Sequence, residues 1–292
     1  DANANVTIAS PDTAVNGITK LGNNSTLVLQ GNYVATGGIQ AANAGNGTLK
    51  FTNNNAATLT GLIGNAAKSL NIIEFAGNDV TFAGGATAHD ADKTFVFSGE
   101  SAMKVTFDAA TNLGNNVFTN NTTTTHTVIL ANAANNFTKN LSTDVTKQLN
   151  FQLANGVDAE ISGGDATGTN FTTGVDGKGE LNLNKADLVI NSVGAVDKSL
   201  AKVEFTENAT VNNNTYAAEV QVNAGKIATL SGTIKSANFH LDGVDAKAIF
   251  ADNAKIESVI KSTVGAEGLV EFAGNVNINE DLGVSGKALK KV

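Results

Sequence analysis

A short phrase recurs along this chain at a nearly constant interval. Residues 73–78 are Ile-Glu-Phe-Ala-Gly-Asn, and residues 270–275 repeat the last five of these after a Val. Weaker copies share a Phe, a small residue, a variable residue and then Asn or another polar residue. Several consecutive copies lie roughly 21 to 24 residues apart, which is the interval of a repeat architecture. The Phe residues of the weaker copies are Phe51, Phe97, Phe118, Phe137, Phe205 and Phe250.

The length of the repeat selects among repeat architectures. About 22 residues hold two or three short strands and their turns, at roughly 3.3 Å per residue. This is too short for a propeller blade, and the chain lacks the Leu-x-x-Leu-x-Leu pattern of a leucine-rich repeat. The sequence therefore predicts an all-β protein, a right-handed parallel β-helix (β-solenoid) of about 22 residues per rung.

The phrase has the pattern of a strand followed by a tight turn. Glu74 lies between Ile73 and Phe75, so the two apolar side chains share one face of a strand. The small residue and the Asn that follow tolerate the backbone of a turn. We therefore expect buried rings, stacked in register, at Phe51, Phe75, Phe205, Phe250 and Phe272. We expect turns after strands, with amide ladders along the stack, at Asn54, Asn78, Asn121, Asn208, Asn253 and Asn275.

The repeat covers most of the chain, which predicts one elongated β-solenoid over residues 1–292. Residues 156–179 have the densest glycines and the poorest periodicity. We interpret them as a protruding loop or as a joint between two solenoid halves. Loops on a rigid scaffold often carry binding residues. The candidate interaction loop therefore contains Gly163, Gly164, Asp165, Asp176 and Lys178.

The absence of two residue types, Cys and Arg, limits the chemistry open to the chain. The chain has no Cys among its 292 residues, so the fold relies on neither disulfides nor a thiolate metal site. All its basic residues are Lys, whereas Arg is the usual residue for bidentate recognition of phosphate. With a net charge of −8 the chain repels a phosphate backbone. Nucleic acid is therefore not an expected partner.

The composition is typical of a long bacterial surface protein: acidic, without Cys, and rich in Asn, Thr and Gly. No run approaches the roughly 20 apolar residues of a membrane helix, so we expect no membrane-spanning segment in this chain. The sequence begins at Asp1, with neither Met nor an apolar signal region. We expect a processed or excised segment whose export signal has been removed.

The sequence lacks the motifs of enzymes built on β-helices. A pectate-lyase-like site needs a catalytic Arg, and a polygalacturonase-like site needs adjacent aspartates and Gly-His-Gly; neither occurs here. His89, His126 and His240 are not at ligand spacing and are interpreted as strand or turn residues. The acidic stretches at residues 89–92 and 163–165 do not repeat as in calcium-bound β-rolls. We therefore predict no catalytic, metal-binding or cofactor-binding residues, and no cofactor.

The run Gly-Thr-Leu-Lys-Phe-Thr-Asn-Asn-Asn-Ala-Ala-Thr-Leu-Thr-Gly at residues 47–61 resembles the passenger repeats of rickettsial surface cell antigens. That autotransporter family includes the outer membrane proteins A and B. Residues 71–78 and 202–211 look similar too. The resemblance implies an autotransporter passenger displayed as a parallel β-helix on the extracellular face of the bacterial outer membrane, or secreted. It also implies a role in host-cell adhesion and invasion or in a protein layer, and it transfers no catalytic residues.

Three functions are compatible with the sequence. The leading hypothesis is a non-enzymatic adhesin that presents its side and its loops to a host cell-surface receptor protein. The second is a surface-layer or fibre subunit that binds neighbouring copies of itself through exposed strand edges. The third is a β-helix carbohydrate-active enzyme, which the missing site motifs disfavour. Host-cell binding by the monomer, ordered arrays and release of reducing sugar would distinguish the three.

Overall fold

The repeated phrases build strands and turns along the described part of the protein. The computed structural model describes residues 3–9, 13–15, 17–31, 33–35, 37–65, 67–86, 94–109, 113–132, 135–154 and 156–292. Within these ranges the chain forms 31 strands and no helix. The strands stack in parallel as a β-solenoid of about 12 turns, with equivalent residues roughly 22 positions apart. The parallel β-solenoid predicted from the repeat is therefore confirmed.

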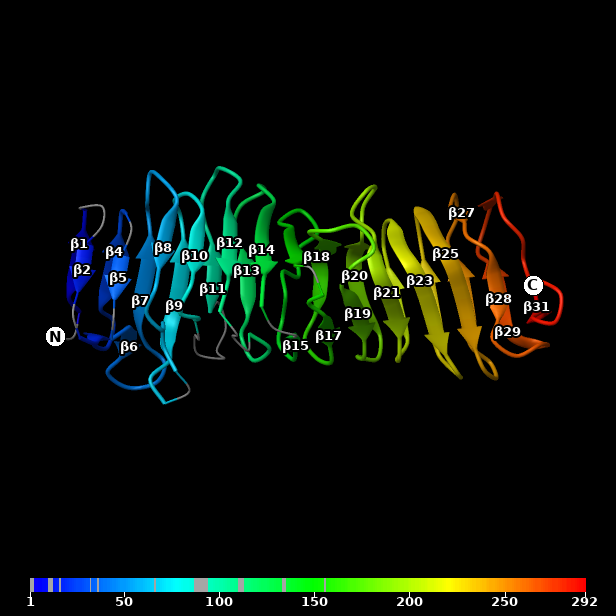
Figure 1. Ribbon diagram of the computed structural model, residues 1–292, viewed down its shortest axis with the longest axis horizontal. Helices are drawn as coiled ribbons and strands as arrows, with labels where there is room; N and C mark the ends of the chain where they lie inside the picture. Colours follow the sequence, from blue (N-terminus) through cyan, green and yellow to red (C-terminus); the bar gives the residue numbers. More distant parts are fainter. Residues whose placement is uncertain are drawn as a thin grey trace. The chain divides into compact units, whose positions relative to one another are not determined.

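The strands belong to two compact units, Asp1–Phe151 and Gln152–Val292, and Figure 1 labels most of the strands. The strands that begin in the first unit are β1 (Asn5–Ile8), β2 (Thr13–Val15), β3 (Thr19–Leu21), β4 (Thr26–Leu29), β5 (Tyr33–Ala35), β6 (Ile39–Ala41), β7 (Asn46–Phe51), β8 (Ala57–Leu59), β9 (Leu70–Phe75), β10 (Val80–Phe82), β11 (Phe95–Phe97), β12 (Lys104–Phe107), β13 (Phe118–Asn120), β14 (His126–Leu130), β15 (Asn135–Phe137) and β16 (Leu149–Leu153). Those of the second unit are β17 (Ala159–Ile161), β18 (Ala166–Thr173), β19 (Glu180–Leu183), β20 (Leu188–Val193), β21 (Leu200–Phe205), β22 (Ala209–Val211), β23 (Thr215–Asn223), β24 (Ile227–Leu230), β25 (Thr233–Asp242), β26 (Lys247–Phe250), β27 (Lys255–Glu257), β28 (Ile260–Ser262), β29 (Glu267–Phe272), β30 (Asn277–Ile278) and β31 (Leu289–Lys291).

In the first unit, six parallel strands form one sheet in the order β1-β4-β7-β9-β11-β13. A second series of parallel pairs joins β8, β10, β12 and β14. Because each strand pairs with the equivalent strand of the next turn, the side chains of one face line up from turn to turn. Phe75 therefore lies between Phe51 of β7 and Phe97 of β11.

Phe rings fill the interior of this unit. Phe51 and Phe75 are 0% exposed, and their ring centroids lie 5.6 Å apart in a stacked arrangement. Phe97 continues the column at 5.0 Å from Phe75. On the outer face of the same strands, Lys50 Nζ donates to Glu74 Oε1 at 2.8 Å. The predicted alternation of Phe inside and charge outside is confirmed here.

The second unit has the same construction (Figure 1). β19, β21, β23 and β25 pair in parallel along one face, and β20, β22, β24 and β26 pair along another. Phe205 on β21 and Phe250 on β26 are both 0% exposed. The copies of the phrase that contain Phe205 and Phe250 therefore lie on different faces of the solenoid. Each turn has more than one strand–turn corner, and the phrase marks more than one of them.

Phe272 departs from the expected burial. Its ring lies 6.0 Å from that of Phe250, but it is only partly buried. The reason is that β31 pairs with β29 only at Glu267 and Leu269, so the Phe272 end of β29 is not covered by β31. The prediction of full burial is wrong for Phe272 and confirmed for the other four rings.

The Asn residues that end the phrase lie in turns. All six are outside strands and follow one, which confirms this prediction. Asn253 has the left-handed backbone conformation, with φ of 62°. An Asn tolerates this conformation better than most residues, because its short polar side chain can hydrogen-bond locally. The six are Asn54, Asn78, Asn121, Asn208, Asn253 and Asn275.

The predicted amide ladder forms on other Asn residues. Asn191 Nδ2 donates to Asn170 Oδ1, and Asn213 Nδ2 donates to Asn191 Oδ1, each at 2.7 Å. By contrast, Asn78 Nδ2 donates to the backbone oxygen of Asn53 at 3.3 Å. The phrase does not return to the same corner in every turn, so its Asn residues do not form one continuous column.

Candidate functional site

Residues 156–179 form part of the solenoid wall rather than one long loop. β17 and β18 occupy much of this segment, and they pair with β19 and β20 of the next turn. The buried residues of β18 include Gly168, Thr169 and Thr173. Small and hydroxyl-bearing residues at inward positions hide the apolar alternation that identifies a strand. The segment therefore forms two strands and two short turns rather than one protruding loop, and the alternative of a joint between two solenoid halves stays a prediction.

The first of these turns connects β17 to β18 and contains Gly163, Gly164 and Asp165. Gly164 has φ of 65°, which a residue with a side chain rarely adopts. Asp165 Oδ1 accepts a hydrogen bond from Lys185 Nζ at 2.7 Å. Lys185 belongs to the following turn of the solenoid, so this contact joins successive turns.

The second turn, residues 174–179, contains Asp176 and Lys178, and it contacts an equivalent loop one turn further along. That loop, residues 194–199, connects β20 to β21. Asp176 Oδ1 accepts hydrogen bonds from the Ser199 N–H at 2.8 Å and from the Ser199 hydroxyl. The Gly177 N–H donates to the Ser199 backbone oxygen at 2.8 Å. These donors stabilise the ionised carboxylate, and the hydroxyl and N–H of Ser199 lower the pKa of Asp176.

The next turn of the solenoid has no such loop. Val193 pairs with Thr215, and Leu200 pairs with Ala217. Tyr216 alone therefore lies opposite the whole of residues 194–199. Gly194 makes this change of direction possible: its φ is 65°, and a Cβ there would lie 2.0 Å from the Tyr216 backbone oxygen. The loop thus leaves the wall directly beside Tyr216 and overhangs a flat part of β23 and β25.

The overhanging loop, β23, β25 and β27 border an open hollow of about 400 Å³, which we call the ledge groove. Val196, on the overhanging loop, is 69% exposed. Tyr216, Lys235 and Glu257 are in register on three successive turns and form a row along the groove. The lining includes Asp176, Val196 and Asp197 from the loops, Tyr216 and Ala218 from β23, Lys235 and Ala237 from β25, and Glu257 from β27.

Carboxylates outnumber amines along the ledge groove. Lys235 Nζ lies 3.9 Å from Glu257 Oε2, so its charge is partly balanced. The hydrogen bond from Lys255 and then the charges of Lys255 and Lys235 lower the pKa of Glu257. Asp197 has φ of 59°, and its carboxylate makes no hydrogen bond or ion pair with the residues that the structure describes. The lining thus offers three carboxylates, one amine and one aromatic ring.

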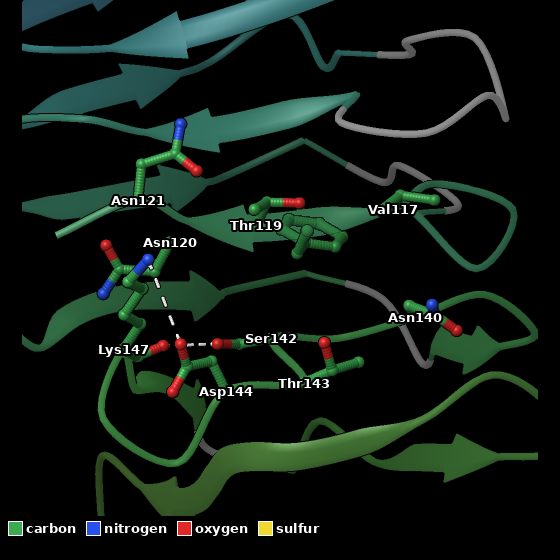
Figure 2. Close-up of a pocket in the computed structure, with 10 residues that line it drawn as sticks. Val117, Thr119, Asn120, Asn121, Asn140, Ser142, Thr143, Asp144 and Lys147 are labelled. Atoms are coloured by element: carbon green, nitrogen blue, oxygen red, sulfur yellow. Dashed lines mark hydrogen bonds and ion pairs between the residues drawn. The ribbon is translucent and has the colours of Figure 1, made fainter.

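A second hollow, of about 320 Å³, lies in the first unit beside β13 (Figure 2). Its polar groups are largely engaged with one another. Asn120 Nδ2 donates to the Thr124 backbone oxygen at 2.8 Å, the Ser142 hydroxyl donates to the Lys147 backbone oxygen, and Lys147 Nζ lies 3.9 Å from Asp144 Oδ2. The first contact stabilises the turn after β13, and the other two stabilise the loop of residues 142–147. The ledge groove is therefore the stronger candidate for binding.

The two described histidines, His126 and His240, do not form a site. His126 is buried, its ring stacks on Phe97 with centroids 5.4 Å apart, and Nε2 lies 3.1 Å from Thr122 Oγ1. Burial lowers the pKa of both His126 and His240. His89, with the acidic stretch at residues 89–92, lies outside the described residues. Among the residues that the structure describes, no three His, Cys, Asp or Glu residues are grouped as metal ligands.

Sequence reasoning found Asp176 but missed Tyr216 and Val196. A signal for the groove was present in the spacing of the repeat. The step from Leu183 to its partner Phe205 is 22 residues, whereas the step from Phe205 to its partner Val222 is 17 residues. A shorter step indicates a solenoid turn without a loop at that corner. Where the preceding turn has the loop, the loop projects past the shorter turn and a groove forms beneath it.

Comparisons with protein-family models, with curated proteins and with solved structures find no match. In the described ranges, no helix has the length and apolar character needed to cross a membrane.

Proposed function

We propose that this protein is a non-enzymatic adhesin of the bacterial cell surface, which attaches to a receptor protein of a host cell. The observation that carries the proposal is the ledge groove. It lies where a loop leaves the wall, and it exposes Val196 and part of Tyr216 beside several carboxylates. Exposed aromatic and aliphatic side chains within a polar rim are typical of protein-binding surfaces. The sequence resemblance to autotransporter passengers supports the same function and the same location.

The solenoid suits this function because its wall holds short loops on a rigid support. Residues 174–179 and 194–199 are joined by the hydrogen bonds between Asp176, Gly177 and Ser199. A loop held in one conformation loses little entropy on binding, which favours affinity.

Attachment of the purified chain to cultured host cells tests the proposal. We expect saturable attachment of the monomer, and we expect Val196→Ser and Tyr216→Leu to reduce it. Val244→Ser serves as a matched control, because Val244 is also exposed, at 57%, but lies on a different turn. Absence of attachment by the folded monomer, or release of reducing sugar from a polysaccharide, would contradict an adhesin function.

Self-assembly into a surface layer or fibre is a second candidate, favoured by one edge of β29. Within residues 156–292, β31 pairs with β29 at Glu267 and Leu269 only, and Phe272 is partly exposed at the far end. An uncovered strand edge can pair with a strand of another chain. Sedimentation over a range of concentrations distinguishes the two candidates: assembly that Phe272→Ser weakens would favour the layer.

A further inference from the structure

We propose that the ledge groove binds an extended, basic segment of the partner protein, with Lys or Arg side chains directed at Asp197 and Tyr216. This inference rests on the proposed function, since it specifies the chemistry of the partner that the adhesin contacts.

The charges of the lining favour a cationic ligand. Asp176, Asp197 and Glu257 face a single amine, that of Lys235. Glu257 already binds Lys255 and lies 3.9 Å from Lys235, so these two amines more than balance its single negative charge. The negative charge that no amine of the lining balances is therefore at the loop end of the groove, on Asp176 and Asp197. Opposite charges across an interface set which partners are accepted.

The floor of the groove favours an extended chain with long side chains. Ala218 and Ala237 project only methyl groups from successive strands, so the backbone of a ligand can approach the wall closely. The methylene stems of Lys and Arg can pack against Val196 and these methyl groups. Their charged ends then reach the Asp197 carboxylate or the face of the Tyr216 ring, which attracts cations.

Two further amines belong to the same loops but lie outside the ledge groove. Lys178 and Lys198 are exposed residues of the two loops and do not line the ledge groove. A ligand in the groove therefore meets the carboxylates of the loops rather than their amines.

Binding of model peptides tests the inference. The probe is a short capped peptide of alternating Ala and Lys with a fluorescent label, and its counterpart has Glu in place of Lys. Binding to the full chain is followed by fluorescence anisotropy at about 20 mM and about 300 mM salt, because screening weakens exposed charge pairs. The variants are Asp197→Asn and Tyr216→Leu. Asp187→Asn is the matched control, since Asp187 is exposed and has φ of 56°, close to the 59° of Asp197, but lies outside the groove.

We expect the Lys peptide to bind and the Glu peptide not to bind. Asp197→Asn should weaken binding about threefold to fivefold, as loss of one exposed charge contact does. Tyr216→Leu should weaken it about threefold through loss of the cation–ring contact. Asp187→Asn should leave it unchanged, and circular dichroism should show that all variants are folded.

Several results would overturn the inference. Equal weakening by Asp187→Asn and Asp197→Asn would mean that only the overall charge attracts the peptide. Competition by a neutral oligosaccharide would point to a glycan ligand, and self-association weakened by Asp197→Asn would point to a second copy of this chain. If host-cell attachment survives Asp197→Asn and Tyr216→Leu, the adhesin function stands and the ledge groove is not its binding site. If the peptide binds but the protein does not attach to host cells, the ledge groove is a binding site for basic segments and the adhesin function is wrong.

Discussion

The side-chain oxygen of Asn208 accepts a hydrogen bond from the backbone N–H of Ile227 at 2.9 Å, across two successive turns of the solenoid. Asp158 accepts from the Glu180 N–H in the same way, also at 2.9 Å. In each pair a turn residue supplies the acceptor for an N–H near the start of a strand in the next turn. A backbone N–H at the start of a strand needs such an acceptor, because an unmade hydrogen bond is costly.

Asn208→Ala should therefore lower the free energy of unfolding by about 1 kcal/mol, the net value of one such hydrogen bond. Asn208→Asp keeps the acceptor oxygen and should lower it less. Asn212→Ala is the control, because Asn212 lies in an exposed turn of the same unit. Urea unfolding of the three variants measures the difference, and equal effects at positions 208 and 212 would refute a specific role for the bond.

Phe75→Ala should destabilise the first unit by about 3 to 5 kcal/mol, because it removes a large buried ring. Phe75 contacts the rings of Phe51, Phe82 and Phe97 at centroid distances of 5.6, 6.0 and 5.0 Å. Phe272→Ala should lower the free energy of unfolding of the second unit by clearly less, because Phe272 is only partly buried. Chemical unfolding, with hydrogen exchange to separate the two units, checks this ranking.

Replacing residues 194–199 by a single Tyr should remove the overhang and leave the wall intact. The structure already contains this shorter connection, since Tyr216 alone joins Thr215 to Ala217 opposite that loop. We expect unchanged far-ultraviolet circular dichroism and reduced host-cell attachment. Deletion of residues 163–178 is the contrasting variant: it removes all of β18 and should lower the unfolding midpoint. A shortened loop that unfolds the protein would show that the overhang supports the wall.

Acid should weaken the first unit through His126. Burial lowers the pKa of His126 below the value of about 6.5 of an exposed imidazole. The unfolded chain therefore binds a proton at a pH where the folded chain does not. The contribution of His126 is complete above about pH 6.5 and is lost as the pH falls through that value toward the folded pKa. His126→Phe should show a smaller loss of stability than the wild type between about pH 7.5 and pH 5, measured by urea unfolding; an identical loss would contradict this role.

The sequence predicted the wall of the solenoid well, because its signals are local. A Phe on the inner face and an Asn at the following turn can be recognised at Phe75 and Asn78 without knowledge of the fold. β18 escaped recognition because its buried positions hold Gly168, Thr169 and Thr173, whose burial depends on the neighbouring turns.

The ledge groove could not be predicted from motifs, because none of its residues is distinctive alone. Tyr216 and Asp197 come together only through the pairing of Val193 with Thr215 and of Leu200 with Ala217. That register depends on the lengths of successive turns. Counting residues between equivalent strand positions is therefore a better search for such grooves than searching for residue types.

The pairing on either side of Tyr216 also means that the number of residues in this corner does not set the register of the wall strands. The strands before and after it keep their register whether one residue or the whole of residues 194–199 connects them. We therefore expect insertions and deletions here to change the displayed surface without changing the register of the strands. The corner between Val193 and Leu200 is accordingly a natural position for grafting foreign peptides, and a place where recognition can diversify while the scaffold stays constant.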